Sequence, residues 1–407
     1  MGDFYQNGII TTLHNLSQRP LEAMEQELRD FSHTRPMGLI LPSLYSELLG
    51  DALPNIVKEI AKVDYLQEIV IGLDRANEEE YRHALEFFKP LKQNFKVLWN
   101  DGPRLQAIDN TLKAEGLSPM EPGKGRNVWY CMGYTLASGK TESIALHDCD
   151  IVTYDRSLLA RLLYPVANPN FNYEFCKGYY ARVANGKIHG RVSRLLVTPL
   201  IRALIRTIGH SPYLDFIDSF RYPLAGEFSF RADVMTDIRI PSDWGLEIGV
   251  LSEMNRNYAN NRLCQADIAD IYDHKHQELS PEDSARGLSK MSIDIAKALF
   301  RKLATNGVVF TPETFRSIKA SYYRIALDFV ETYYNDARMN GLKFDIHSEE
   351  KAVELFAKNI LTAGQSFLEN PMDKPFVPSW NRVTSAIPNV LESIYDAVDK
   401  DMEEYSK

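Results

Sequence analysis

The sequence predicts an α/β fold, in which a mostly parallel sheet is covered on both faces and followed by an all-helical C-terminal extension. Two observations support this prediction. Short apolar, β-branched runs alternate with helical patterns over residues 37–150, as is typical of βαβ units whose strands are buried by helices on both sides. From residue 280 onward the apolar residues recur three and four positions apart in long runs, which indicates amphipathic helices.

Expected strands and helices alternate along the first 150 residues. The segment LEAMEQELRDF has helical spacing and ends before Arg35-Pro36, so residues 1–37 are expected to form a polar, partly helical leader. The first strand is expected at MGLIL, directly before Pro42, with a helix at LPNIVKEIAKV after it. Strand QEIVIGLD, helix EEEYRHALEFFKPLK and strand FKVLWND come next, and a helical region, GKGRNVWYCMGYTLAS, leads into the strand SIALHDCD.

Beyond Asp150 the pattern is mixed, with short strands in NYEFCKGYYARVANG and a helix in RVSRLLVTPLIRALIRTIG. Ser280-Pro281-Glu282-Asp283 and Thr311-Pro312-Glu313 both carry helix-start signals, a hydroxyl residue followed by Pro and acids. We therefore expect a leader (1–37), a sheet domain (38–280) and a helical extension (281–407). The apolar face of the extension is expected to pack on the chain's own core, with a second subunit as the alternative: Tyr322, Tyr323, Ile325, Ala326 and Phe329.

Composition excludes several classes of protein. Of 407 residues 44% are hydrophobic and 25% charged, as in globular proteins rather than disordered ones. The net charge of −9 argues against generic nucleic-acid or anionic-membrane binding. The four cysteines form no CxxC pair, and neither a secretory signal nor a membrane-length apolar run is evident. A reduced, cytoplasmic protein is expected.

Acidic side chains follow several of the expected strands, at Asp74, Asn100-Asp101 and His147-Asp148-Cys149-Asp150. Ligands of such sheets bind at the carboxyl ends of the strands. Acids one residue apart point to the same side of an extended chain, and their hard oxygens suit Mg²⁺ or Mn²⁺. A neutral His from Asp273-His274-Lys275-His276 could complete the metal site. The alternatives are solvated acids and exposed histidines.

Four further segments could bind anions or sugars. In Gly123-Lys124-Gly125-Arg126 the glycines leave backbone amides open beside a lysine. Gly190-Arg191-Val192-Ser193 lies at an expected helix N-terminus. Leu224 and Glu247 belong to YPLAGE and SDWGLE, which pair small glycines with acids. The second segment lies in an acid-free stretch, 175–214, which we call the basic island and which contains Lys177, Arg182, Lys187, Arg191, Arg194, Arg202 and Arg206. Ordinary loops and a solvated helix face are the alternatives.

Taken in order, LPSLYSE, GKG, DxD, GRV, PLxGE, WGxEIG and a late His resemble retaining glycosyltransferases of the GT-A fold, and among them the glucosyl-3-phosphoglycerate synthase family. The resemblance covers residues 38–280. It implies metal-dependent transfer of a hexose, with glucose expected, from a UDP-, GDP- or ADP-sugar to 3-phosphoglycerate. The alternatives are a mannosylglycerate synthase-like enzyme or another GT-A transferase with a different small acceptor such as glycerate, and a non-catalytic sugar-nucleotide scaffold. A homodimer is possible.

The resemblance also implies roles for single residues. Asp150 and His274 would hold Mg²⁺ or Mn²⁺. Asp150, Lys124, Glu247 and Leu224 form the expected catalytic set, the last two at the sugar end of the donor pocket. The donor would contact Pro42, Ser43, Leu44, Glu47, Asp74, Lys124, Asp148 and Cys149, and the acceptor Arg182, Gly190, Arg191, Val192 and Ser193. The chain departs from the family pattern at Tyr45-Ser46, Cys149 and Tyr272.

Overall fold

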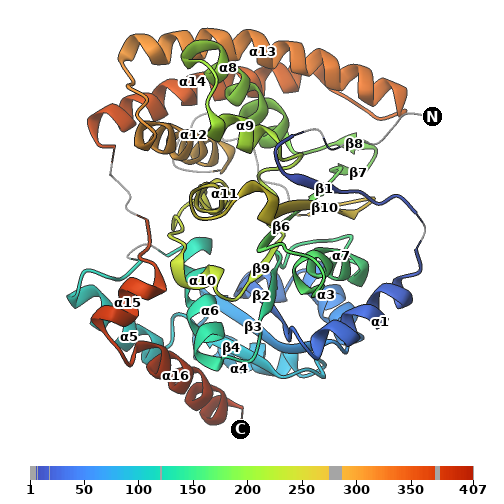
Figure 1. Ribbon diagram of the computed structural model, residues 1–407, viewed down its shortest axis with the longest axis vertical. Helices are drawn as coiled ribbons and strands as arrows, with labels where there is room; N and C mark the ends of the chain where they lie inside the picture. Colours follow the sequence, from blue (N-terminus) through green and yellow to red (C-terminus); the bar gives the residue numbers. More distant parts are fainter. Residues whose placement is uncertain are drawn as a thin grey trace.

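A mostly parallel sheet is the centre of the computed structural model, which describes residues 6, 8–17, 19–119, 122–274, 287–371 and 376–406. Within these residues the sheet has eight strands in the order β1-β10-β6-β9-β5-β2-β3-β4 (Figure 1). All neighbours run parallel except β9, which is antiparallel to both β5 and β6. The strands are β1 (Thr11–Leu13), β2 (Met37–Leu44), β3 (Leu66–Asp74), β4 (Phe95–Trp99), β5 (Ser143–Leu146), β6 (Phe175–Tyr180), β9 (Phe228–Arg231) and β10 (Leu263–Ala269). A small hairpin pairs β7 (Val183–Ala184) with β8 (Lys187–Ile188).

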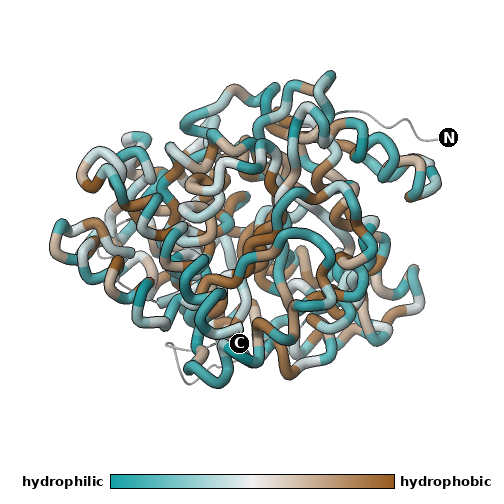
Figure 2. Tube along the Cα trace, turned by 90° about the horizontal axis from the view of Figure 1, so that it is seen from below, coloured by the Kyte–Doolittle hydropathy of each residue, from teal (hydrophilic) through white to brown (hydrophobic). Residues whose placement is uncertain are grey.

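Helices cover both faces of this sheet, which explains why its strands are mostly apolar. One face packs on α1 (Leu21–Ser32), α2 (Tyr45–Leu48), α3 (Ala52–Ile60), α4 (Glu78–Phe88) and α7 (Arg156–Ala167). The other packs on α5 (Pro103–Ala114), α6 (Lys124–Ser138), the π-helix η1 (Val192–Val197), α8 (Thr198–Ile208), α9 (Pro212–Asp218), α10 (Val234–Asp237) and α11 (Leu246–Asn257). A 3₁₀ turn, η2 (Asn260–Arg262), leads into β10. In Figure 2 hydrophobic stretches cross the middle of the molecule, and shorter ones occur among the hydrophilic stretches of its outline.

The C-terminal part is helical and packs in two places (Figure 1). The helices α12 (Gly287–Thr305), α13 (Pro312–Met339) and α14 (Ile346–Glu369) pack together and against η1, α8 and α11. The helices α15 (Trp380–Ala386) and α16 (Val390–Tyr405) return to α5, α6 and β4 at the far end of the sheet. There the Trp380 ring stacks on Trp129 with centroids 4.0 Å apart. In α13, Tyr322, Ile325 and Ala326 are buried within the chain itself.

Most of the expected elements are present. The first strand, however, continues through Pro42 to Leu44, because it runs between β3 and β5 and its C-terminal residues still pair with β3. The leader is not separate from the sheet, because Thr11–Leu13 pairs with β10 as an edge strand. Thr311 caps α13 by accepting a hydrogen bond from the Thr314 amide. The start signal at Ser280 lies outside the described residues, as do Lys275 and His276.

No helix among the described residues combines the length and the apolar character needed to cross a membrane.

Candidate active site

Three residues of the expected site meet around one ammonium group at the carboxyl end of the sheet. Lys124, the first residue of α6, places Nζ 2.6 Å from Asp148 Oδ1 and 3.1 Å from Glu247 Oε1. Burial alone lowers the pKa of Lys124, but the carboxylates of Asp148 and Glu247 outweigh burial and raise this pKa above its usual range. Burial alone would raise the pKa of Asp148, and the Lys124 charge reverses this, so that the pKa is lowered. The ammonium and the Asp148 carboxylate therefore stabilise each other as ions.

Glycines allow this close approach. A Cβ on Gly226 would lie 2.4 Å from Asp148 Oδ2, so any side chain there would displace the carboxylate. A Cβ on Gly125 would lie 2.1 Å from the Pro241 carbonyl oxygen. The glycine of PLxGE thus allows the turn before β9 to lie against the acidic strand end, and the second glycine of GKG allows the start of α6 to lie against the segment before α11.

Asp150 and His274 lie together beside this cluster. His274 Nδ1 is 3.7 Å from Asp150 Oδ2. The segments that carry them run side by side, since Val152 donates its amide to the Asp273 carbonyl at 2.8 Å and Ile151 forms an antiparallel β-bridge with His274. Backbone pairing, rather than a loop conformation alone, brings the late histidine to the acidic strand end.

The surroundings of Asp150 fit a divalent cation. Burial, with further contributions from the negative charges of Asp148 and Glu47, raises the pKa of Asp150 to about 7. Its Oδ1 is buried and accepts no hydrogen bond from the described residues. A bound cation would supply both the missing positive charge and the missing partner. No group of three His, Cys, Asp or Glu side chains suited to a metal is found within the described residues. Phosphate and water oxygens would therefore complete the shell, as Mg²⁺ commonly requires.

The expected donor residues line the carboxyl ends of β2, β3 and β5. Burial raises the pKa of Asp74 to about 6, although Asn100 donates a hydrogen bond to Asp74 Oδ1 at 2.7 Å. Ser43 and Cys149 are buried, whereas Glu47 is half-buried and close enough for its charge to raise the pKa of Asp150. Pro42 and Leu44 also lie half-buried on β2. Leu224 packs half-buried against the core in the turn before β9.

Arg182 and Gly190 meet at the other end of the site. A Cβ on Gly190, whose φ is +77°, would lie 3.5 Å from Arg182 Cδ and 3.4 Å from Tyr222 Oη. Arg182 donates to Tyr222 Oη at 3.3 Å, while its buried Nε has no hydrogen-bond partner among the described residues. Val192 and Ser193 open the π-helix η1, and both are buried. Arg191, just before η1, pairs with Glu349 of α14 at 2.6 Å.

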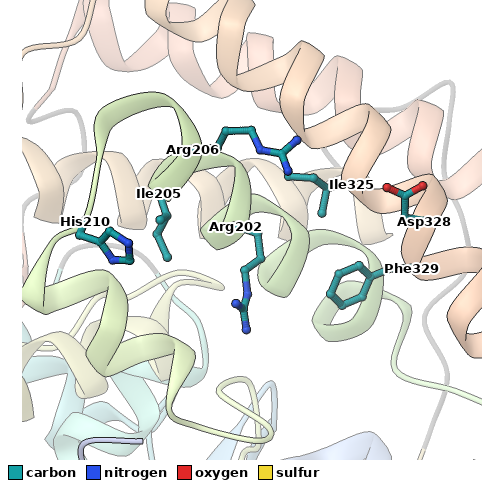
Figure 3. A pocket seen from close by; sticks show the side chains of 7 residues that line it. All are labelled: Arg202, Ile205, Arg206, His210, Ile325, Asp328 and Phe329. Atoms are coloured by element: carbon teal, nitrogen blue, oxygen red, sulfur yellow. The ribbon is translucent and has the colours of Figure 1, made fainter.

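The basic residues of the island lie in different surroundings. Lys177 is fully buried in β6, and Arg202 pairs with Asp218 at 2.8 Å. A separate open pocket of about 550 Å³ lies between α8 and α13 (Figure 3). It is lined by Arg202, Ile205, Arg206, His210, Ile325, Asp328 and Phe329.

Several residues near the site received no functional role from the sequence. Glu227, in PLxGE, is fully buried and accepts hydrogen bonds from Tyr180 at 2.6 Å and Tyr272 at 2.5 Å. The two tyrosine rings stack 3.6 Å apart. Tyr272, which departs from the family pattern, is thus a donor to a buried carboxyl. The sequence could have marked Lys177 as unusual, since a lysine inside the apolar run FCKGYY is rare. It could not have marked Glu349, because Glu349 lies outside the motifs.

Comparison with known proteins identifies the family. The glucosyl-3-phosphoglycerate synthase of Persephonella marina is 46% identical to this chain over 98% of the chain and 99% of that protein. The chain belongs to the glucosyl-3-phosphoglycerate synthase family. A second member, from Methanococcoides burtonii, is 39% identical over 99% of both chains. A scan against family models gives no match.

Solved structures support the fold of this family member. Glucosyl-3-phosphoglycerate synthase from Mycobacterium tuberculosis, in complex with Mn²⁺, UDP-glucose and phosphoglyceric acid, matches with a TM-score of 0.54 at 17% identity, over 74% of this chain and 89% of that one. Mannosyl-3-phosphoglycerate synthase from Rubrobacter xylanophilus matches equally well, with a TM-score of 0.54 at 18% identity over 74% of this chain and 83% of that one. The GT-A sheet predicted from the sequence is therefore confirmed.

Proposed function

We propose that this chain transfers glucose from UDP-glucose to 3-phosphoglycerate with Mn²⁺ or Mg²⁺ bound, giving glucosyl-3-phosphoglycerate. The observation that carries this proposal is the identity of 46% to a glucosyl-3-phosphoglycerate synthase over nearly the whole of both chains. The cluster of Lys124, Asp148 and Glu247 beside Asp150 and His274 supplies groups suited to this chemistry.

The roles of the residues follow from their chemistry. Asp150 and His274 would hold the cation, which when bound stabilises negative charge on the leaving nucleoside diphosphate. Lys124 would donate hydrogen bonds to the same diphosphate, since its ammonium already lies among carboxylates at the end of the sheet. Glu247 would accept hydrogen bonds from sugar hydroxyls, with Leu224 as an apolar contact.

The donor nucleoside would lie along the strand ends. Asp74 and Glu47 offer acceptors for its polar hydrogens, and the remaining donor contacts are Pro42, Ser43, Leu44, Asp148 and Cys149. At the other end, Arg182 and the segment 190–193 would hold the anionic groups of the acceptor. Much of the rate would then come from placing the acceptor hydroxyl beside the anomeric carbon. No side chain stands out as a covalent nucleophile, so a front-face displacement with retention is proposed.

The domain bounds, the location and the oligomeric state are also proposed. Residues 38–280 are proposed as the transferase domain, with 1–37 and 281–407 as a leader and an extension that complete its packing. A cytoplasmic location and a homodimer are predictions, and light scattering of the purified protein would test the second.

A panel of donors and acceptors tests the function. UDP-, GDP- and ADP-sugars, glucose and mannose, are combined with 3-phosphoglycerate and glycerate in Mn²⁺ or Mg²⁺, and release of nucleoside diphosphate is measured. Release that requires both UDP-glucose and 3-phosphoglycerate supports the proposal. A preference for glycerate would favour a mannosylglycerate synthase-like enzyme instead. Absence of metal-dependent donor binding in calorimetry would favour a non-catalytic scaffold.

A further inference from the structure

One buried carboxylate connects the C-terminal helices to the proposed acceptor segment. Glu349, on α14, is only 4% exposed. Its Oε1 lies 2.6 Å from Arg191 Nε and its Oε2 lies 2.9 Å from Arg194 Nη2. Each carboxylate oxygen thus accepts from a different arginine, and the two arginines flank the start of η1.

Further contacts fix the same two arginines. Arg194 donates from Nε to the His189 carbonyl at 2.8 Å, which ties the guanidinium to the turn before Gly190. Arg194 also stacks its guanidinium over the Tyr333 ring of α13, 4.7 Å from the centroid. Arg191 donates from Nη2 to Ser348 Oγ at 2.9 Å. The side chains that bracket the acceptor segment are therefore oriented by the helical extension.

The backbone near this segment is tied to the extension as well. Lys343, between α13 and α14, donates its amide to the Gly186 carbonyl of the β7–β8 hairpin at 2.8 Å. Tyr322 of α13 donates to the Leu195 carbonyl of η1 at 2.6 Å. A π-helix is rare and is frequently found at functional sites. Both α13 and α14 of the extension contact η1.

The charges explain why Glu349 matters. Two guanidinium groups face one carboxylate, so the cluster keeps a net positive charge for an anionic acceptor. Without the carboxylate, the nearly buried Arg194 would lose its charged partner and the two cations would repel each other. Arg191 is still 30% exposed, and its bonds to Glu349 and Ser348 use Nε and Nη2, so Nη1 is not engaged by either.

We propose that Glu349 is a positioning residue for the acceptor: it orients Arg191 and the 190–193 segment without touching the substrate. This inference rests on the proposed function, in which that segment binds 3-phosphoglycerate. It assigns the helical extension a part in acceptor affinity.

The test is steady-state kinetics of Glu349→Gln, which keeps the size of the side chain and removes its charge. We expect the KM for 3-phosphoglycerate to rise at least about tenfold, as for the loss of one charge-assisted hydrogen bond. The KM for UDP-glucose should stay within about twofold, because the donor site makes no contact with Glu349. Glu349→Asp, which keeps the charge, should recover part of the loss. Ser348→Ala, a milder change, should raise the same KM about threefold and serves if Glu349→Gln does not fold.

Asp401→Asn is the matched control. Asp401 is a buried carboxylate of α16 that pairs with Arg104, far from the acceptor segment. The Asp401→Asn substitution should lower the stability of the protein without changing the KM for either substrate. An unchanged acceptor KM in Glu349→Gln, or an equal rise for donor and acceptor, overturns the inference. If Glu349→Gln fails to fold, an unchanged acceptor KM in Ser348→Ala overturns it. If the unmodified protein does not use 3-phosphoglycerate, the proposed function itself fails, and that result is distinct.

Discussion

Lys124 Nζ lies 2.6 Å from Asp148 Oδ1, so the first acid of the DxD segment is paired with the lysine of GKG. The two segments are contributed by α6 and by the end of β5, and Gly226 lets the Asp148 carboxylate approach from the side of β9. An incoming diphosphate would compete with Asp148 for this ammonium. The pair therefore keeps the lysine charged and in place before the donor binds.

Lys124→Met should lower kcat by about 10²-fold or more, because it removes a preorganised positive charge beside the leaving group. The substitution keeps the length of the side chain and leaves Asp148 and Glu247 unpaired. Initial rates at saturating substrates provide the measurement. Lys400→Met, which breaks an exposed pair with Asp396 on α16, is the control and should leave kcat unchanged. A Lys124→Met variant with full kcat would contradict the proposed role.

Gly226→Ala should impair metal-dependent activity while leaving the protein folded. The added Cβ would lie 2.4 Å from Asp148 Oδ2, so the carboxylate must move away from residue 226, which disturbs its pairing with Lys124. We expect kcat to fall at least about tenfold, since a displacement of roughly 1 Å in an active site can cost up to 10²-fold. Rates and circular dichroism of the variant check both parts. A fully active Gly226→Ala variant would show that the position of Asp148 is unimportant.

Asp150→Asn and His274→Gln should each weaken Mn²⁺ binding by at least about tenfold, since each removes one of two proposed protein ligands. Calorimetric titration of Mn²⁺ into the protein with UDP present measures this without turnover. His210→Gln is the control, because His210 is 83% exposed and lies in the separate pocket. Unchanged Mn²⁺ affinity in both site variants would place the metal elsewhere.

Some strands and helices could be predicted from the sequence and others could not. The strands β2 to β5 were predictable because each is a continuous apolar run bounded by polar residues. Strand β1 was not, since the residues Thr11–Leu13 are too few to form a pattern and pair with β10, which is remote in sequence. Helix α5 was also missed, because it begins at Gly102-Pro103, which reads as a turn.

In the candidate site, too, some residues could be found from local motifs and others could not. Asp148, Asp150, Lys124 and His274 belong to motifs with short-range signals, and the structure brings them together. Glu349 and Tyr272 act through partners far away in sequence, which no local pattern reveals. Charge counted along the chain did not reveal how the basic island is arranged, since Lys177 is buried in β6 whereas Arg202 pairs with Asp218 of α9.

Tyr272→Phe should lower the free energy of unfolding by about 1–3 kcal/mol, because it leaves Glu227 Oε1 without its hydroxyl donor in a buried environment. The ring itself is retained, so its stacking on Tyr180 should persist. Urea unfolding followed by fluorescence measures the change. Tyr322→Phe, which removes a bond to a neutral carbonyl, should cost less. An equal cost in both variants would mean that the Glu227 carboxyl gains nothing special from Tyr272.

Lys177→Met should stabilise the protein at pH 7. The Lys177 ammonium is fully buried in β6, 5.2 Å from the Phe228 ring centroid, with no hydrogen-bond partner among the described residues. Burial lowers the pKa of Lys177 to about 8, against the partial opposition of Glu247 and Glu227, whereas an unfolded lysine titrates at 10.5. At pH 7 the Lys177 ammonium is charged in both the folded and the unfolded protein. Burying this charge costs the folded state about 3 kcal/mol, and methionine would remove that cost.

The extra stability of Lys177→Met over the unmodified protein should depend on pH, and this dependence is the sharper test. Between pH 8 and 10.5 the unfolded chain holds a proton that the folded chain has released, so the unmodified protein gains stability relative to Lys177→Met as pH rises. The advantage of the variant should therefore be full below about pH 8 and fade toward pH 10.5. Urea unfolding of both proteins at pH 7 and pH 10 measures it. Lys140→Met should instead destabilise, because Lys140 pairs with the buried Glu68 at 3.1 Å. A variant whose advantage is constant across this range would show that Lys177 does not titrate there.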